Sequence, residues 1–190
     1  MKIGLFFGSF NPIHIGHMAI AQYMTEHTDL DQVWFVVTPQ SPFKKQNSLL
    51  DQHHRLMMTR IATEDYPKII ASNIEFDLPK PSFTIDTLTY LNEKYASYNF
   101  NLIMGQDNLS TLHKWKNFNL ILSNYKIYVY PRLNNKKSKL ENHQQINFTK
   151  APIIDISSSL IRKSIKKGKN VSCFLPKDVW TYLDEMNFYK

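Results

Sequence analysis

The chain has 190 residues, which is enough for one ordinary domain with a substantial core. Its 23 lysines and arginines against 16 aspartates and glutamates give a net charge of +7, which favours anionic partners, although a lysine-rich surface also serves solubility alone. A single cysteine, Cys173, excludes an internal disulfide and fits a reducing compartment. No apolar run approaches the roughly 20 residues that span a membrane, and the first residues lack a signal-peptide layout. We therefore expect a cytoplasmic protein with no membrane partner.

Strand-like and helix-like segments alternate along the chain. Apolar runs predict strands or extended segments over 3–7, 33–37, 69–76, 101–104, 126–130 and 153–156, and helical spacing predicts helices over 17–26, 50–64, 84–95, 158–167 and 177–186. This alternation is typical of an α/β fold with a doubly wound parallel sheet flanked by helices. We expect a single domain over residues 1–190, in which the polar, basic segment 134–150 forms a surface excursion because it lacks apolar periodicity.

In such a sheet, ligands bind at the carboxyl ends of the strands, near the point where the strand order reverses. The loops after Phe7, Thr38, Met104 and Ile156 are therefore expected on one edge, and all four carry polar or basic residues.

Residues 8–17 (GSFNPIHIGH) are the most informative stretch of this edge, since they join a predicted strand to a predicted helix. The turn exposes backbone N–H groups, and the start of the helix adds unpaired donors and a positive dipole end, which together suit a phosphate. His14 and His17 fall on one face if the first helical turn includes both, and each can donate to a charged oxygen. Zinc is the alternative ligand, but a structural zinc needs further cysteine or histidine ligands, so we expect no metal site in the protein.

Two further segments carry phosphate-binding side chains. Residues 156–162 (ISSSLIR) lie where a predicted strand ends and a predicted helix begins. One of the three serines is explained as the N-cap of that helix. The other two hydroxyls, together with Arg162, are suited to bind a polyphosphate. Residues 42–45 (PFKK) form a basic loop, with Arg55 on the helix that follows. On the ligand edge, Lys44 becomes a phosphate contact, whereas elsewhere it would simply be solvated.

Residues 105–107 (GQD) follow a strand, and an aspartate there can bind a ribose hydroxyl or orient a metal-bound water. Trp115 either stacks on a flat ring or packs in the core. Thr84 either caps a helix or contacts a ligand. Other chemistries lack their motifs: no Gly-x-Ser-x-Gly elbow supports acyl transfer, and neither a P-loop nor a Gly-x-Gly-x-x-Gly dinucleotide fingerprint follows the first strand.

Several of these segments resemble motifs of a known family. Residues 8–17 are similar to the His-x-Gly-His signature of the nucleotidyltransferase superfamily, and residues 157–162 resemble its second motif, Ser-x-Ser/Thr-x-x-Arg. Within that superfamily, residues 42–44 (PFK), 82–88 (SFTIDTL), 105–107 (GQD) and Trp115 resemble the bacterial nicotinate-nucleotide adenylyltransferases, with matching order and spacing over essentially the whole chain.

The resemblance implies one nucleotidyltransferase domain with a Rossmann-like fold. The implied reaction transfers an adenylyl group from ATP to the 5′-phosphate of nicotinate mononucleotide and yields nicotinate adenine dinucleotide and pyrophosphate, a step of NAD biosynthesis. ATP and nicotinate mononucleotide are the implied partners. Mg²⁺, carried mainly by the phosphates, is the implied cofactor.

The same resemblance implies roles for individual residues. The catalytic residues would be His14, His17, Lys44 and Arg162, and they would hold the phosphates of ATP. His17 would lie nearest the α-phosphate, and Lys44, in its loop, would neutralise the charge of a phosphate. Ser158 and Ser159 would join Arg162 at the β- and γ-phosphates. The nucleotides would contact Gly8, Ser9 and Phe10 at the turn and Gly105 and Asp107 elsewhere. Thr84 and Trp115 would face the nicotinate ring.

The sequence departs from the family pattern at Phe7, where a glycine is usual, and at Asn11, where an aspartate is common. Phe43 and Phe83 replace a frequent histidine and tyrosine, and Ser159 stands where threonine is commoner. Sister activities on nicotinamide mononucleotide or phosphopantetheine are the alternatives, and recognition of the acid through backbone N–H groups would be invisible in sequence. A non-catalytic nucleic-acid-binding domain is an alternative of another class, but the basic residues are scattered and no such motif is present, so we expect no nucleic-acid partner. A homo-oligomer stays open.

Overall fold

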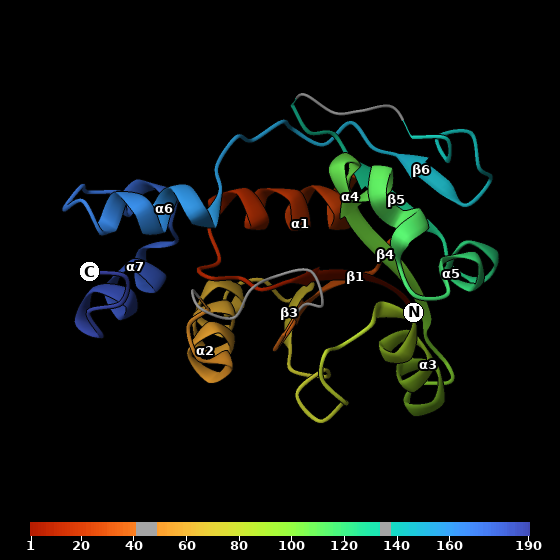
Figure 1. The fold of residues 1–190 in the computed structure, drawn as a ribbon, viewed down its shortest axis with the longest axis horizontal. Helices are drawn as coiled ribbons and strands as arrows, with labels where there is room; N and C mark the ends of the chain where they lie inside the picture. Colours follow the sequence, from red (N-terminus) through yellow and green to blue (C-terminus); the bar gives the residue numbers. More distant parts are fainter. Residues whose placement is uncertain (41–48, 134–137) are drawn as a thin grey trace.

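A six-stranded parallel sheet runs through the molecule in the computed structural model, which describes residues 1–40, 49–133 and 138–190 (Figure 1). The strands are β1 (Lys2–Gly8), β2 (Gln32–Val37), β3 (Ile69–Ser72), β4 (Asn99–Gly105), β5 (Ile127–Tyr130) and β6 (Ile146–Phe148). They lie in the order β3-β2-β1-β4-β5-β6, and every neighbouring pair is parallel. The strand order therefore reverses between β1 and β4, and the predicted doubly wound α/β architecture in one domain is confirmed.

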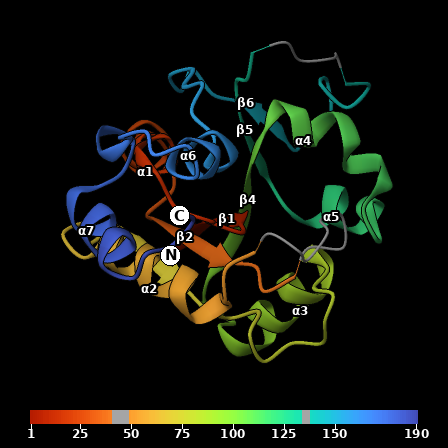
Figure 2. The same ribbon diagram turned by 60° about the vertical axis from the view of Figure 1, so that its left-hand side comes forward.

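Helices cover both faces of the sheet, and each face has its own hydrophobic cluster (Figure 2). One cluster joins the sheet to α1 (Ile15–His27), α2 (Gln52–Thr63), α6 (Ser158–Ile165) and α7 (Lys177–Glu185). The other joins it to α3 (Thr84–Lys94), α4 (Gln106–Thr111), α5 (Phe118–Asn124) and the short helix η2 (Leu112–Lys114). A second short helix, η3 (Ser172–Phe174), leads into α7.

The sequence of β1 explains why this strand is central. Its interior is apolar at every position, and successive side chains point to opposite faces. Ile3 and Leu5 are fully buried in the cluster of α3–α5, while Phe6 enters the cluster of α1 and α2. β1 consequently has a strand on each side, with Gly8 opposite Val37 and Phe6 opposite Ile103.

Two expectations about the C-terminal half were wrong. Residues 153–156 are not a strand, and the sixth strand is Ile146–Phe148, which lies inside the segment expected as a surface excursion. The three residues of β6 pair with β5 alone and bury chiefly Ile146, so their pattern is too short to stand out. Ile154 instead lies near Gly16 at the start of α1, while Ile153 is exposed at the surface.

Helices α4 and α5 were not predicted. They have six and seven residues, and only Leu109 of α4 and Ile121 and Leu122 of α5 are buried, which is too few positions for a helical period to be recognised. In the region expected to be extended over 69–76, the strand ends at Ser72, and Phe76 N–H donates to Asn73 O in a turn.

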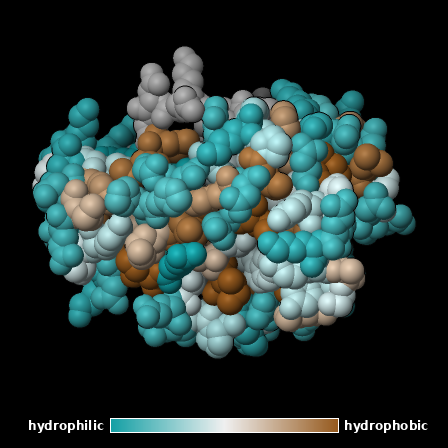
Figure 3. Space-filling view, turned by 90° about the horizontal axis from the view of Figure 1, so that it is seen from below, coloured by the Kyte–Doolittle hydropathy of each residue, from teal (hydrophilic) through white to brown (hydrophobic). Residues whose placement is uncertain are grey.

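The surface mixes polar and apolar side chains. On the face seen in Figure 3, hydrophobic residues form separate patches between hydrophilic ones. None of the helices in the described part of the chain has the length and apolar character required to cross a membrane.

Candidate functional site

The turn after β1 begins with an uncommon backbone conformation at Phe10. Its φ of +43° lies in the left-handed region, which bulky residues rarely adopt and which is enriched at functional sites. The Phe10 ring is only 2% exposed and packs edge-on against Phe6 and Phe35. It also lies under Gly8, where an added Cβ would come within 2.7 Å of the ring. The buried ring leaves only the backbone of Phe10 available for a nucleotide, and that contact stays a prediction.

Helix α6 holds the same turn from a segment about 150 residues away, and Figure 1 shows the two helix starts, α1 and α6, side by side. Ser157 caps α6 by accepting from Leu160 N–H at 3.2 Å. Ser158 Oγ donates to Pro12 O at 2.8 Å, and Arg162 Nη1 donates to Asn11 O at 2.7 Å. The loops after Phe7 and Ile156, which were expected on one edge of the sheet, are thus in direct contact.

Arg55 anchors the turn from another side. Its side chain is 1% exposed, and its guanidinium donates to Ser9 O at 2.7 Å, Thr38 O at 2.8 Å and Pro39 O at 3.0 Å. Its Nε donates to Leu50 O at 2.9 Å. Arg55, which the sequence placed beside the basic loop, therefore ties the ends of β1 and β2 to the start of α2.

His14 and His17 lie together at the start of α1. His14 is the N-cap residue, and its ring stacks on that of His17 with centroids 3.7 Å apart, so the expected shared face is confirmed. His14 N–H donates to His17 Nδ1 at 3.2 Å. Because Nδ1 accepts this bond, the ring proton of neutral His17 lies on Nε2, which makes Nε2 a donor.

The two histidines differ in burial. His14 is 4% exposed, and its Nδ1 has no hydrogen-bond partner among the described residues. Burial, together with the nearby charge of Arg132, lowers the pKa of His14 from 6.5 to about 4. His14 is therefore neutral at neutral pH and offers a ring N–H without a charge of its own.

Gly16 creates the space for the His14 ring. A Cβ at this position would lie 3.1 Å from both Cε1 and Nδ1 of His14 and 3.3 Å from Ile154 Cγ2. The group that comes close to Gly16 is thus a protein side chain.

A small cleft opens beside the histidines on the α1 face of the sheet. It has a volume of about 10 Å³, and its lining includes His14, His17, Tyr130, Arg132 and Ile154. Arg132 lies over the Tyr130 ring at 5.2 Å. Sequence reasoning missed Arg132, although its place just after β5, at the carboxyl edge of a parallel strand, was a usable signal.

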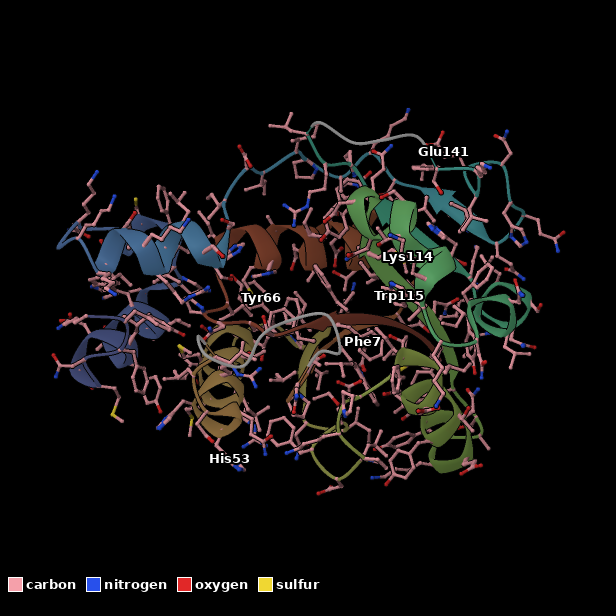
Figure 4. All side chains as sticks on the ribbon, viewed as in Figure 1. Phe7, His53, Tyr66, Lys114, Trp115 and Glu141 are labelled. Carbon is pink, nitrogen blue, oxygen red and sulfur yellow. The ribbon has the colours of Figure 1, made fainter. Side chains whose placement is uncertain are left out.

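A much larger cavity of about 450 Å³ opens on the other side of the same turn. Its lining comes from the end of β1, the start of α3 and the segment around η2, and it includes the predicted Gly8, Ser9, Thr84 and Trp115. Phe7, the departure from the family glycine, also lines it. Figure 4 shows Phe7, Lys114 and Trp115 gathered in this region.

The start of α3 brings to the cavity backbone N–H donors that have no backbone acceptor among the described residues. Phe83 O accepts the N–H groups of Asp86 and Thr87, at 3.0 and 3.2 Å, and these are the first hydrogen bonds of the helix. The N–H groups of Thr84 and Ile85 come earlier in the chain, so they take no part in the hydrogen bonding of the helix. Ser82 Oγ is buried without a partner among the described residues. A helix start with free donors favours a negative ligand group.

Lysines complete this side of the cavity. Lys114 and Lys116 line it, and Lys116 Nζ pairs with Asp86 at 2.8 Å and lies over the Phe83 ring at 4.8 Å. This pair ties the Trp115 segment to α3. Trp115 is partly buried in the cluster of α3–α5 and also lines the cavity, so it packs in the core and is accessible from the cavity, while stacking on a ligand ring stays a prediction.

Glu75 is a buried cavity residue that sequence reasoning missed, as it missed Lys114 and Lys116. It is 1% exposed, and its Oε1 accepts from Thr87 Oγ1 at 2.7 Å, while Oε2 has no partner among the described residues. Burial raises the pKa of Glu75 above its usual value, and the hydrogen bond from Thr87 opposes that shift. Its place just beyond β3, on the ligand edge, was the available signal.

Gly105 and Asp107 lie at the end of β4. Gly105 is the N-cap of α4, and a Cβ there would collide with Asp107 Oδ1 and approach Tyr130 to 3.2 Å. Asp107 is well exposed and lies 3.9 Å from Arg132 Nε. This group therefore adjoins the histidine cleft. Lys44 and Phe43 lie outside the described residues.

Comparison with known proteins supports one family. The sequence pattern of the cytidylyltransferase-like family matches residues 5–164. A protein of Flavobacterium psychrophilum named "Probable nicotinate-nucleotide adenylyltransferase" is 57% identical over the whole of both chains. A protein of Bacteroides thetaiotaomicron with the same name is 39% identical over 97% of this chain and 92% of its own.

A solved structure has the same fold. The Plasmodium falciparum nicotinic acid mononucleotide adenylyltransferase complexed with NaAD superposes with a TM-score of 0.83, covering 99% of this chain and 97% of that one at 20% identity.

Proposed function

Because this chain belongs to the cytidylyltransferase-like family, among the nicotinate-nucleotide adenylyltransferases, we propose that its turn after β1 holds ATP on one side and nicotinate mononucleotide on the other. The observation that carries this proposal is the position of the turn, between the histidine cleft and the 450 Å³ cavity at the switch point of the sheet. A single turn that borders two ligand spaces suits a reaction that joins two nucleotides.

The reaction needs alignment more than acid–base chemistry. An oxygen of the mononucleotide 5′-phosphate forms a bond to the α-phosphorus of ATP, the bond from that phosphorus to the bridging oxygen of the β-phosphate breaks, and pyrophosphate leaves with the electron pair. The nucleophile is already an anion, so no covalent enzyme intermediate is required. The protein then contributes by positioning both phosphates and by stabilising negative charge.

On the ATP side, we assign the α-phosphate to His17, whose Nε2–H is set as a donor by the bond at Nδ1. His14 donates from its neutral ring beside it. The β- and γ-phosphates fall to Ser158, Ser159 and Arg162 at the start of α6, which already touches the turn. The histidine cleft is too small for adenine, so the adenosine would lie over the adjoining surface near Asp107 and Arg132.

On the other side, we assign the pyridine ring to the cavity beside Trp115. Two features of the described residues favour a carboxylate over a neutral amide: the N–H groups at the start of α3 that have no backbone acceptor there, and the charge of Lys114. This arrangement supports nicotinate as the ring. The backbone of Gly8, Ser9 and Phe10 would lie between the two nucleotides.

Mg²⁺ would accompany the triphosphate. Among the described residues no three acidic, histidine or cysteine side chains gather as a metal cage, and Mg²⁺ commonly keeps its waters and binds through substrate phosphates. Lys44 keeps its proposed role at a phosphate. We assign the reaction to the cytoplasm, where ATP is made and a free thiol such as Cys173 stays reduced.

The activity is tested by pyrophosphate release with the purified chain, ATP and Mg²⁺. We expect turnover with nicotinate mononucleotide and a much lower kcat/KM with nicotinamide mononucleotide. Efficient use of the nicotinamide nucleotide would contradict the assignment of the carboxylate to α3. Turnover of phosphopantetheine in place of both would contradict the proposed function itself.

His17→Ala tests the role at the α-phosphate. Loss of one positioned donor to developing charge typically costs about 100-fold or more in kcat, and we expect a loss of this size with an unchanged thermal midpoint. His27→Ala is the matched control, because His27 ends the same helix and stacks on Tyr23 far from the turn. Near-normal kcat in His17→Ala would remove His17 from the mechanism.

A further inference from the structure

The C-terminal tail reaches the phosphate-binding turn. Beyond α7, Asn187 and Tyr189 both have positive φ, at +55° and +65°, so two of the three residues from 187 to 189 adopt the left-handed backbone conformation. Phe188 N–H donates to Leu183 O at 3.1 Å, and the Phe188 ring packs on His54 of α2 with centroids 4.8 Å apart. A tyrosine in the left-handed region is strained, and it persists here because the surrounding contacts hold it.

The Tyr189 hydroxyl ends on the side chain of Asn11. It donates to Asn11 Oδ1 at 2.6 Å, across 178 residues of sequence. The same oxygen accepts the N–H of Leu50 at 3.2 Å, which identifies this atom as the amide oxygen, since both partners are donors. Asn11 is 1% exposed, so it joins the turn, the start of α2 and the tail inside the protein.

The surroundings of the phenol keep it a donor. Tyr189 lies near the guanidinium groups of Arg55 and Arg162, the two arginines that bind backbone carbonyls of the turn. Their positive charge lowers the pKa of Tyr189, but its burial raises it by more, so the hydroxyl keeps its proton at neutral pH.

We propose that Tyr189 is a positioning residue for adenylyl transfer, which fixes Asn11 and thereby the turn that presents His14 and His17 to ATP. This inference rests on the proposed function. Asn11 lies between Phe10, with its left-handed backbone, and the His14 side of the turn, and Arg162 holds its carbonyl. Arg162 binds the backbone carbonyl of Asn11 and Tyr189 binds its side chain, so both parts of the residue are held in place. The turn therefore has little conformational freedom.

The departure from the family aspartate at this position fits the same account. An asparagine oxygen accepts the two donors, Leu50 N–H and Tyr189 O–H, without placing a negative charge where ATP phosphates bind.

Tyr189→Phe tests this role, because it removes the hydroxyl and keeps the ring. We expect kcat to fall about tenfold, since small displacements of reacting groups are costly, while the KM for nicotinate mononucleotide stays within about twofold. Tyr182→Phe is the matched control: Tyr182 is in α7, its hydroxyl bonds His54 Nδ1 at 2.8 Å, and it does not touch the turn. This control should keep the wild-type kcat.

A readout independent of turnover separates this inference from the proposed function. Hydrogen exchange of the peptide that covers residues 9–14 should be faster in Tyr189→Phe than in the wild type and unchanged in Tyr182→Phe. In a double-mutant cycle, Asn11→Ala and Tyr189→Phe should be non-additive in kcat, because each removes the same bond.

Two results would overturn the positioning role. One is a Tyr189→Phe protein that melts earlier yet keeps its kcat and its exchange rates at 9–14. The other is an equal loss of kcat in Tyr182→Phe. Should the wild type prove inactive with nicotinate mononucleotide, the exchange experiment still decides whether Tyr189 holds the turn.

Discussion

Single side chains of this site take their chemistry from burial. His14 shows this most clearly, because desolvation alone favours its neutral form and the charge of Arg132 adds to the effect. The neighbouring His17 is defined by one backbone hydrogen bond, which decides the nitrogen that carries its proton. The residue type therefore determines the chemistry available to each side chain, and its surroundings determine which protonation state or tautomer is present.

The depressed pKa of His14 predicts how stability depends on pH. The unfolded chain binds a proton at His14 near pH 6.5 and the folded protein only near pH 4, so stability is intact above pH 6.5 and falls as the pH drops toward 4. For this residue the loss between pH 7 and pH 5 amounts to about 2 kcal/mol.

Urea unfolding at both pH values measures this contribution. His14→Gln should lose less stability than the wild type over the same interval, by about that 2 kcal/mol. Equal pH dependence in the two proteins would show that His14 does not titrate with a depressed pKa.

At the scale of elements, the strand–turn–helix unit from β1 to α1 depends on small residues where side chains or ligands must come close. Gly8 accommodates the Phe10 ring, and Gly16 accommodates the His14 ring. Helix α6 then holds the turn through Ser158 and Arg162. These contacts let a short loop keep one shape.

Gly16→Ala tests this close packing. The new Cβ would press on the His14 ring and on Ile154, so we expect kcat to fall about tenfold through displacement of the ring. The thermal midpoint should change little, because alanine favours a helix by up to about 1 kcal/mol relative to glycine.

Gly168→Ala is the contrasting control. Gly168 has a φ of +66° and no atoms near its would-be Cβ, so alanine there is strained but touches nothing. It should lower the free energy of unfolding by about 1 kcal/mol and leave kcat unchanged. A loss of kcat in both variants would point to general destabilisation.

At the scale of the whole molecule, the sheet topology brings the site together. The order reverses between β1 and β4, and the chain uses that point for the turn, the histidine cleft and the cavity. Arg55 links the ends of β1 and β2 to the start of α2 through four bonds to carbonyl oxygens. One buried side chain therefore joins three separate segments at the ligand edge.

Arg55→Met should destabilise the fold by about 3 kcal/mol, because buried carbonyl oxygens lose their donors. Denaturant unfolding of Arg55→Met and Arg60→Met measures the difference, since Arg60 is an exposed residue on the same helix. The control should stay within about 0.5 kcal/mol of the wild type, and a similar small loss in Arg55→Met would contradict the anchoring role.

The sequence predicted the elements that have a strong local period. β1, β2 and α1–α3 appear close to where apolar spacing placed them, and the edge that carries the ligand loops followed from the alternation of strands and helices. The sequence did not reveal α4, α5 and β6, whose few buried residues carry no period. It also predicted a strand over 153–156, where Ile154 and Ile156 line the histidine cleft instead. Whether the chain forms a homo-oligomer stays a prediction.

By itself, the sequence determined the residue types at the site and their order, because the strand–turn–helix pattern and the serine–arginine segment are local. Only the tertiary structure decided which residues contact one another. It shows that Arg55 donates to backbone carbonyls and that Tyr189 donates to Asn11. It also shows that Arg132 lines the histidine cleft and that Glu75 lines the 450 Å³ cavity. The physical reason is that burial and long-range hydrogen bonds depend on packing between segments far apart in the chain. Local periodicity does not encode that packing.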